Sequence, residues 1–122
     1  MRLLGLSLLA LAGCTGVDRN VEPRVTITAG IYGQTTIRND EGYDTSPKYL
    51  TMDVSLLRLD GTPVASVTSG EQGFYELAAE PADYQLCTSH PRCTNLTLVA
   101  EQRVRCDWES GVAARWSCSV KP

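Results

Sequence analysis

Alternation of apolar and polar residues is the main pattern from position 25 to the end of the chain. A period of two places successive side chains on opposite faces and is typical of a β-strand with one buried face. The pattern predicts strands over Val25–Ala29, Ile31–Ile37, Tyr49–Leu59, Val64–Thr68, Phe74–Ala78 and Asp83–Thr88. Within the longest of these the apolar phase shifts after Leu56, which indicates either a bulge or a strand buried on both faces.

The C-terminal third keeps the same period, and Leu96 and Leu98 mark one more strand. The last two strands present apolar faces formed by Val104, Cys106 and Trp108, and by Ala114, Trp116, Cys118 and Val120. Turn residues such as Asp60-Gly61 and Glu109-Ser110-Gly111 separate the strands. About eight short strands with polar turns predict a small all-β antiparallel sandwich or barrel.

The N-terminus shows a different pattern, in which Arg2 and the apolar run Leu3–Ala10 lead to Leu11-Ala12-Gly13-Cys14. A basic residue, a short apolar run and small residues are the parts of a secretory signal, and the run is shorter than the roughly 20 residues that span a bilayer. With a cysteine directly after the small residues, the stretch resembles the lipobox of bacterial lipoproteins. An ordinary signal peptide with a chance cysteine and an uncleaved anchor are the alternatives.

The lipobox resemblance implies that residues 1–13 are removed and that Cys14 carries the lipid. Residues 14–24 would then form a polar tether, and residues 25–122 provide one small domain and no second core. Thr15, rather than aspartate, follows Cys14, which resembles lipoproteins sorted to the outer membrane. The formal net charge of −3 and the lack of a dense basic footprint exclude a nucleic-acid-binding protein.

Four further cysteines lie in the last third, at Cys87, Cys93, Cys106 and Cys118. An even number in an exported chain indicates two disulfides, and without a C-x-x-C pair the spacing does not fit a zinc site. Alternation places Cys106 and Cys118 on inward faces, and it places Cys87 and Cys93 on outward faces. Of the three possible connectivities, we therefore predict Cys87–Cys93 and Cys106–Cys118.

Three short motifs resemble the carboxypeptidase regulatory-like domains, which belong with the transthyretin-like and Cna-B-like sandwiches. They are Asp60-Gly61-Thr62-Pro63-Val64, Gly73-Phe74-Tyr75-Glu76-Leu77 and Tyr84-Gln85-Leu86. The resemblance covers residues 27–87, and it departs from the family at Asp83, where glycine is usual, and in the cysteine-containing hairpins after Cys87. It implies a seven-stranded Ig-like (prealbumin-like) sandwich that acts as a structural or binding module, and it transfers no catalytic residue.

Candidate chemistry is sparse. His90 is the only histidine, so a nucleophile assisted by histidine would have to be built around it, and an exposed turn residue is the simpler interpretation. Asp40, Glu41 and Asp44 lack the ordered spacing of a calcium loop. The sequence therefore predicts no catalytic residue, no metal and no cofactor.

Arginines on the last two predicted strands are the most informative polar feature. Arg103, Arg105 and Arg115 fall on the face opposite Cys106 and Trp116, so they should form a small outward basic patch. The guanidinium fork suits a carboxylate or a phosphate. The patch is either a surface that docks a partner or a set of solvated arginines on a sheet.

These observations predict a non-enzymatic binding or assembly module that is held in the bacterial envelope by lipid on Cys14 and has an envelope protein as its partner. The alternative is a periplasmic inhibitor or immunity-type protein that blocks a lytic enzyme through the loop around His90 or through the arginines.

Overall fold

The computed structural model describes residues 24–38, 48–89, 91–111 and 113–121. Every regular element in this part of the chain is a strand. The nine strands are β1 (Gly30–Ile37), β2 (Lys48–Tyr49), β3 (Asp53–Arg58), β4 (Pro63–Thr68), β5 (Phe74–Ala78), β6 (Ala82–Thr88), β7 (Cys93–Leu98), β8 (Arg103–Ser110) and β9 (Arg115–Lys121). The described residues include no helix that is long and apolar enough to cross a membrane.

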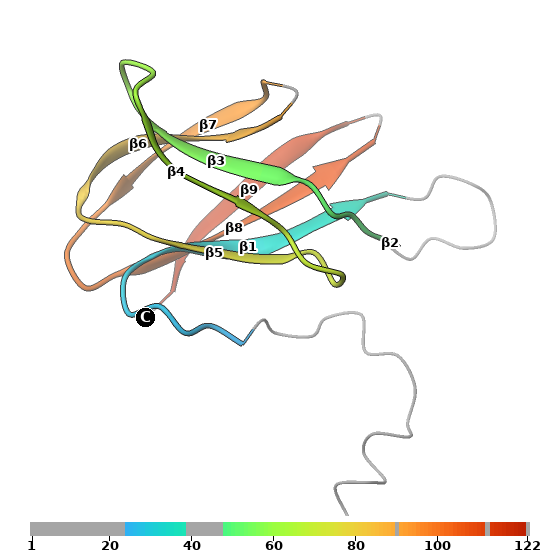
Figure 1. Cartoon of the computed structure of the whole chain (residues 1–122), viewed down its shortest axis with the longest axis horizontal. Coiled ribbons are helices and arrows are strands. Elements are labelled where there is room, and N and C mark those ends of the chain that lie inside the picture. Colours follow the sequence, from blue (N-terminus) through green and yellow to red (C-terminus); the bar gives the residue numbers. More distant parts are fainter. Residues whose placement is uncertain (1–23, 39–47, 90, 112, 122) are drawn as a thin grey trace, which may run out of the picture.

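The strands form two sheets that face one another in a sandwich-like arrangement (Figure 1). Sheet A has the order β2-β1-β8-β9, with β5 also paired to β1, and sheet B has the order β4-β3-β6-β7. The predicted all-β class is confirmed. The prediction of purely antiparallel strands is wrong at one place, because β1 and β8 run parallel with Gly30 opposite Arg103.

The core lies between the two sheets. Sheet A contributes Ile31, Tyr75, Leu77, Val104 and Cys106, and sheet B contributes Val54, Leu56, Tyr84, Leu86 and Leu98. These residues recur at every second position, as expected where each strand has one buried face. The alternation in the sequence therefore identified the core-facing positions of most strands.

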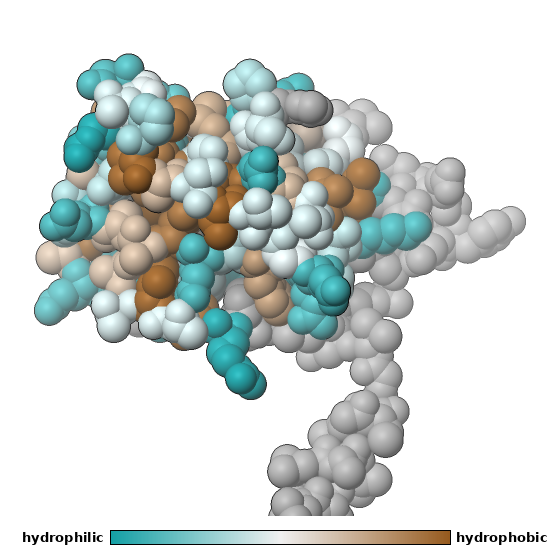
Figure 2. All heavy atoms as spheres, viewed as in Figure 1, coloured by the Kyte–Doolittle hydropathy of each residue, from teal (hydrophilic) through white to brown (hydrophobic). Residues whose placement is uncertain are grey.

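Apolar side chains reach the surface where β4 and β5 face one another (Figure 2). Val64 of β4 is 39% exposed. It lines a depression together with Tyr84 of β6 and small apolar residues of the β5–β6 connection. Both sheets contribute to this depression.

The predicted strand Val25–Ala29 is not formed. Its residues alternate between exposed and half-buried, but a carboxylate of β5 replaces a partner strand. Oε1 of Glu76 accepts the backbone N–H of Thr26 at 2.8 Å and that of Ile27 at 3.3 Å. The Thr26 hydroxyl donates to the other oxygen of Glu76. This bond, together with the two backbone bonds, lowers the pKa of the Glu76 carboxyl. The segment has the alternation of a strand, but its backbone N–H groups donate to the Glu76 side chain and not to a neighbouring strand.

Of the two alternatives for the change of phase after Leu56, a bulge or a strand buried on both faces, the structure has the bulge, since the pairing of β3 with β4 shifts register between Leu56 and Leu57. The predicted strand Tyr49–Leu59 is divided into β2 and β3, which belong to different sheets. The turn predicted at Asp60-Gly61 is also formed. Gly61 has φ = 92°, a conformation that glycine adopts without steric cost.

A buried polar cluster fixes the segment between β2 and β3 against the β4–β5 turn. The hydroxyls of Thr35 and Ser69 lie 2.7 Å apart, and both residues are at most 2% exposed. Ser69 Oγ also accepts the N–H of Met52 at 3.0 Å and donates to the carbonyl oxygen of Leu50 at 3.0 Å. Buried hydroxyls with partners avoid the desolvation cost of an unpaired polar group.

The predicted disulfides are confirmed as Cys87–Cys93 and Cys106–Cys118. Each joins two residues that are directly opposite in an antiparallel pair, β6–β7 and β8–β9 respectively. Cys106 belongs to the core cluster and Cys87 does not, in agreement with the predicted faces. Cys87 is nevertheless only 5% exposed, because it lies in a strand with neighbours on both sides.

The inner face of β9 is less buried than predicted. Trp116 is half-buried, Cys118 is exposed and Val120 is 58% exposed. Among the described residues, β9 is the edge strand of sheet A and pairs only with β8. Alternation gives the face of a side chain but does not show whether the opposite sheet covers it.

Candidate binding face on the β8–β9 hairpin

The register of β8 and β9 places all three predicted arginines on the outer face of sheet A. Val104, Cys106 and Trp108 are buried on the inner face, so the alternate residues of β8 point outward. The opposed outer pairs are Arg103 with Lys121, Arg105 with Ser119, Asp107 with Ser117, and Glu109 with Arg115. The three arginines therefore share one face of the hairpin, as alternation predicted.

The three arginines do not form one cluster. Arg103 lies opposite Lys121 at one end of the hairpin, whereas Arg115 lies opposite Glu109 at the other. The six positions between Arg103 and Glu109 correspond to about 20 Å along a strand. Lys121 was missed in the sequence, because only the register shows that it joins Arg103.

Arg105 is held against its own strand. Its Nε donates to both oxygens of the Asp107 carboxylate, at 3.1 and 3.0 Å. The Arg105 side chain is 16% exposed, compared with 41% for Asp107. Because the two residues are two positions apart on one face of a strand, the ion pair fixes the arginine along the sheet.

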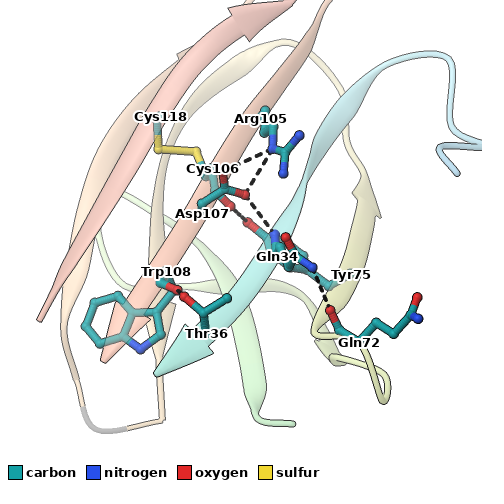
Figure 3. A network of polar contacts seen from close by, with 9 residues as sticks. All are labelled: Gln34, Thr36, Gln72, Tyr75, Arg105, Cys106, Asp107, Trp108 and Cys118. Atoms are coloured by element: carbon teal, nitrogen blue, oxygen red, sulfur yellow. Dashed lines mark hydrogen bonds and ion pairs between the residues drawn. A yellow bond between two sulfur atoms is a disulfide. The ribbon is translucent and has the colours of Figure 1, made fainter. Parts of the chain in front are cut away.

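Asp107 also takes part in a local interruption of the parallel ladder between β1 and β8 (Figure 3). Gly30 N–H donates to Gln102 O at 3.1 Å, and Arg38 N–H donates to Ser110 O at 2.9 Å. In a parallel pair of this register, every second N–H of β1 donates to a carbonyl oxygen of β8, and Gln34 N–H would therefore donate to Cys106 O. Instead, Gln34 N–H donates to Asp107 Oδ1 at 2.9 Å.

The carbonyl oxygen of Cys106 accepts the Tyr75 hydroxyl instead, at 2.5 Å. Tyr75 of β5 is opposite Gly33 of β1, so its side chain crosses β1 where that strand has no side chain. A Cβ on Gly33 would lie 1.8 Å from the Cys106 oxygen. A glycine within a strand pattern indicates such a close approach, and this is the signal that could have located the contact in the sequence.

Burial is the main cause that raises the pKa of the Tyr75 hydroxyl well above its ordinary value; the Asp107 carboxylate also raises it, and Arg105 opposes the shift. The hydroxyl therefore stays protonated and remains a donor to Cys106. Gln34 extends the network, because its Nε2 donates to Gln72 O in the β4–β5 turn at 2.9 Å. Hydrogen bonds from β1 and β5 thus fix the middle of β8, the strand that carries Arg103 and Arg105. The β4–β5 turn in turn fixes the Gln34 side chain.

The arrangement is suited to binding an anion. Arg103 and Lys121 place two cationic side chains at one end of the hairpin, and Ser119 adds a hydroxyl on the same face. Within the described residues no group of three His, Cys, Asp or Glu side chains could hold a metal ion. Cys14, His90 and the acidic residues Asp40, Glu41 and Asp44 lie outside the described residues.

Comparison of the chain with protein-family models, with curated proteins and with solved structures finds no match in any of the three.

Proposed function

We propose that this chain is an exported bacterial lipoprotein whose Ig-like β-sandwich serves as a non-enzymatic binding or assembly module, held at the outer membrane by lipid on Cys14. The observation that carries the binding role is the outer face of β8–β9, where Arg103 and Lys121 are opposed beside the fixed Arg105. Export is supported by the two disulfides, since such bonds persist in oxidising compartments.

The Ig-like part of the proposal rests on the two-layer arrangement and on the turn motifs. The Asp60-Gly61 turn joins β3 to β4, and Tyr84 and Leu86 lie on the core face of β6, as the family resemblance implies. The strands after Cys87, which are β7, β8 and β9, lie outside the resemblance and build one side of each sheet. We attribute the binding role to this additional part.

The partner chemistry follows from the charges. Arginine suits carboxylates because its planar fork can donate two parallel hydrogen bonds. Opposed cations such as Arg103 and Lys121 repel each other when nothing lies between them, and a bound anion relieves that repulsion. The proposal therefore names an acidic surface of an envelope protein as the partner.

Reversal of charge at this face is expected to reduce capture of the partner at least about tenfold. The variant combines Arg103→Glu with Arg105→Gln, because glutamine removes the second charge without placing a carboxylate beside Asp107. Capture from detergent-solubilised envelope, quantified by mass spectrometry, measures the effect. Capture by the native chain should also decline as salt is raised, because screening weakens exposed charge pairs.

The matched control is Arg24→Gln with Arg58→Glu, which changes the net charge equally at two exposed residues away from the hairpin. Its capture should equal that of the native chain. Equal capture by both variants would contradict the proposed face. Inhibition of a lytic enzyme by the purified protein alone would favour the inhibitor over the assembly module.

Substitution of Cys14 by serine is expected to leave the precursor unprocessed, because serine lacks the sulfur to which the lipid is attached. The measurement is the mass of the chain in the membrane fraction, with Thr15→Ser as the control that should be processed normally. A Cys14→Ser chain that lost residues 1–13 and remained in the membrane fraction would refute the lipid anchor.

A further inference from the structure

Strand β9 lacks the features that usually protect an edge against pairing with another chain. An unpaired edge offers a row of N–H and C=O groups, and charges, proline or bulges normally block it. Between Arg115 and Lys121, β9 has five uncharged residues and no proline. The edge strand β4 differs, since it begins at Pro63 and pairs across a bulge.

The inner face of β9 can cover the apolar side of an added strand. Val120 is 58% exposed, Cys118 is exposed and Trp116 is half-buried. These three side chains alternate with Ser117 and Ser119 on the outer face. An added strand would therefore meet an apolar inner side and a polar outer side.

The start of β9 carries a rigid aromatic pair. Trp116 lies directly opposite Trp108, with ring centroids 5.3 Å apart and an interplanar angle of 56°. Trp116 Nε1 donates to Arg92 O at 3.0 Å, and Trp108 Nε1 donates to Ser110 Oγ at 2.6 Å. Trp108 is only 4% exposed and Trp116 is half-buried, so the ring that a ligand can reach is that of Trp116, which is supported from below by Trp108.

Two exposed arginines flank this aromatic pair. Arg92 and Arg115 line a cavity of about 200 Å³ with Trp108 and Trp116, and no carboxylate lines it. Arg92 lies in the turn between β6 and β7 of sheet B, next to the Cys87–Cys93 disulfide, whereas Arg115 belongs to β9 of sheet A. Glu109 lies opposite Arg115 on the outer face, but one carboxylate against two guanidinium groups leaves a net positive charge, which favours an anionic residue over a cationic one.

The same charges disfavour a second copy of this chain. An antiparallel pair of β9 strands centred on Cys118 would place Arg115 of one copy opposite Lys121 of the other, twice. Like charges that are directly opposed in a sheet destabilise the pair. The edge is therefore better suited to a segment whose outward residues are acidic.

We propose that β9 binds an extended acidic segment of a partner protein as an additional strand of sheet A. Its outward acidic side chains meet Arg115 and Lys121, its inward apolar side chains cover Cys118 and Val120, and one acidic residue at its end reaches Arg92. This inference rests on the proposed function. It specifies the chemistry of the partner and adds the edge of β9 as a second contact beside the outer face of β8–β9.

The probe is a fluorescein-labelled peptide of alternating glutamate and valine, as long as β9, titrated with the purified full chain and followed by anisotropy. Two control peptides define the mode: one has lysine for every glutamate, and one is N-methylated at alternate residues. The acidic peptide should bind at least about tenfold more tightly than either, because lysine reverses the charge and N-methylation removes strand hydrogen bonds. Amide hydrogen exchange in β9 should slow when the acidic peptide is bound.

Val120→Lys should weaken binding of the acidic peptide at least about tenfold, because an inward-pointing charge is a natural means of blocking an edge. The control is Val64→Lys on the far edge strand β4, which is 39% exposed and should bind as the native chain does. Arg92→Glu with Arg115→Glu should abolish the preference for the acidic peptide over the lysine peptide.

Equal binding of the N-methylated peptide overturns strand addition, and equal binding of the lysine peptide overturns the charge selection. A dimer in sedimentation that Val120→Lys converts to a monomer shows that a second copy takes the edge and also overturns the proposal. Failure of the peptide to bind while envelope capture still depends on Arg103 rejects this inference alone. If the peptide binds as expected but the Arg103→Glu and Arg105→Gln variant captures the envelope partner as well as the native chain does, only the proposed role of the outer face of β8–β9 is rejected.

Discussion

Replacement of Gly33 by alanine is expected to destabilise the domain by at least about 3 kcal/mol, out of the roughly 5–15 kcal/mol that is usual for a small domain. The new Cβ would lie 1.8 Å from the Cys106 carbonyl oxygen and 2.7 Å from its carbon. Both are backbone atoms in the middle of β8, so relief requires separating β1 from β8. That separation also removes the acceptor of the Tyr75 hydroxyl, and an unpaired buried polar group costs about 1–3 kcal/mol.

Urea denaturation followed by circular dichroism measures the loss. Gly70→Ala is the matched control, because the nearest atom to its added Cβ is Phe74 O at 3.9 Å, which is an ordinary contact. The control should be close to the native chain in stability. A Gly33→Ala chain that unfolds at the same urea concentration as the Gly70→Ala chain would show that β1 and β8 do not approach this closely.

Removal of the Cys106–Cys118 bridge by alanine at both positions is expected to cost about 3 kcal/mol. The two cysteines are 12 positions apart in sequence, and loop-closure entropy assigns about 2.8 kcal/mol to a loop of that length. Cys106 is also fully buried, so its truncation leaves a small cavity with a further cost. The free energy of unfolding of the double variant, from urea denaturation, measures the sum.

The Cys87–Cys93 bridge provides the comparison, since its cysteines are six positions apart and the same relation gives about 2.2 kcal/mol. Replacing this pair should therefore be the less damaging change. The chain with both pairs replaced should retain little of its folded state. A loss below about 1 kcal/mol for the Cys106–Cys118 pair, or a larger loss for the shorter loop, would contradict this account.

The sequence was most informative where one face of a strand is buried. Alternation predicted the core positions of β6 and β8, and the relative phase of the cysteines was sufficient to predict which sulfurs would pair. Both results depend only on local geometry, because side chains on one strand alternate between faces whatever the strand pairs with. The bulge near Leu56 was visible for the same reason, as a change of phase.

The features that were wrong or missed depend on residues far apart in the sequence. Val25–Ala29 has the alternation of a strand, but Glu76 of β5 takes the backbone donors of Thr26 and Ile27. Alternation placed Arg103 and Arg115 on one face, and only the register of β8 with β9 shows the distance between them. The contact of Tyr75 with Cys106 requires three neighbouring strands, an order that no local pattern contains.

The parallel pairing of β1 with β8 also bears on the order in which the molecule can fold. Gly30 pairs with Arg103, so the pair joins the first described strand to the last hairpin and closes a loop of most of the domain. Such distant pairings must overcome a larger chain entropy and are slow to form, whereas the β6–β7 and β8–β9 hairpins need only short loops. We expect the two hairpins to close first and the insertion of β1 between β5 and β8 to complete the fold. A chain truncated before β8 would then leave β1 without its second neighbour and the core open.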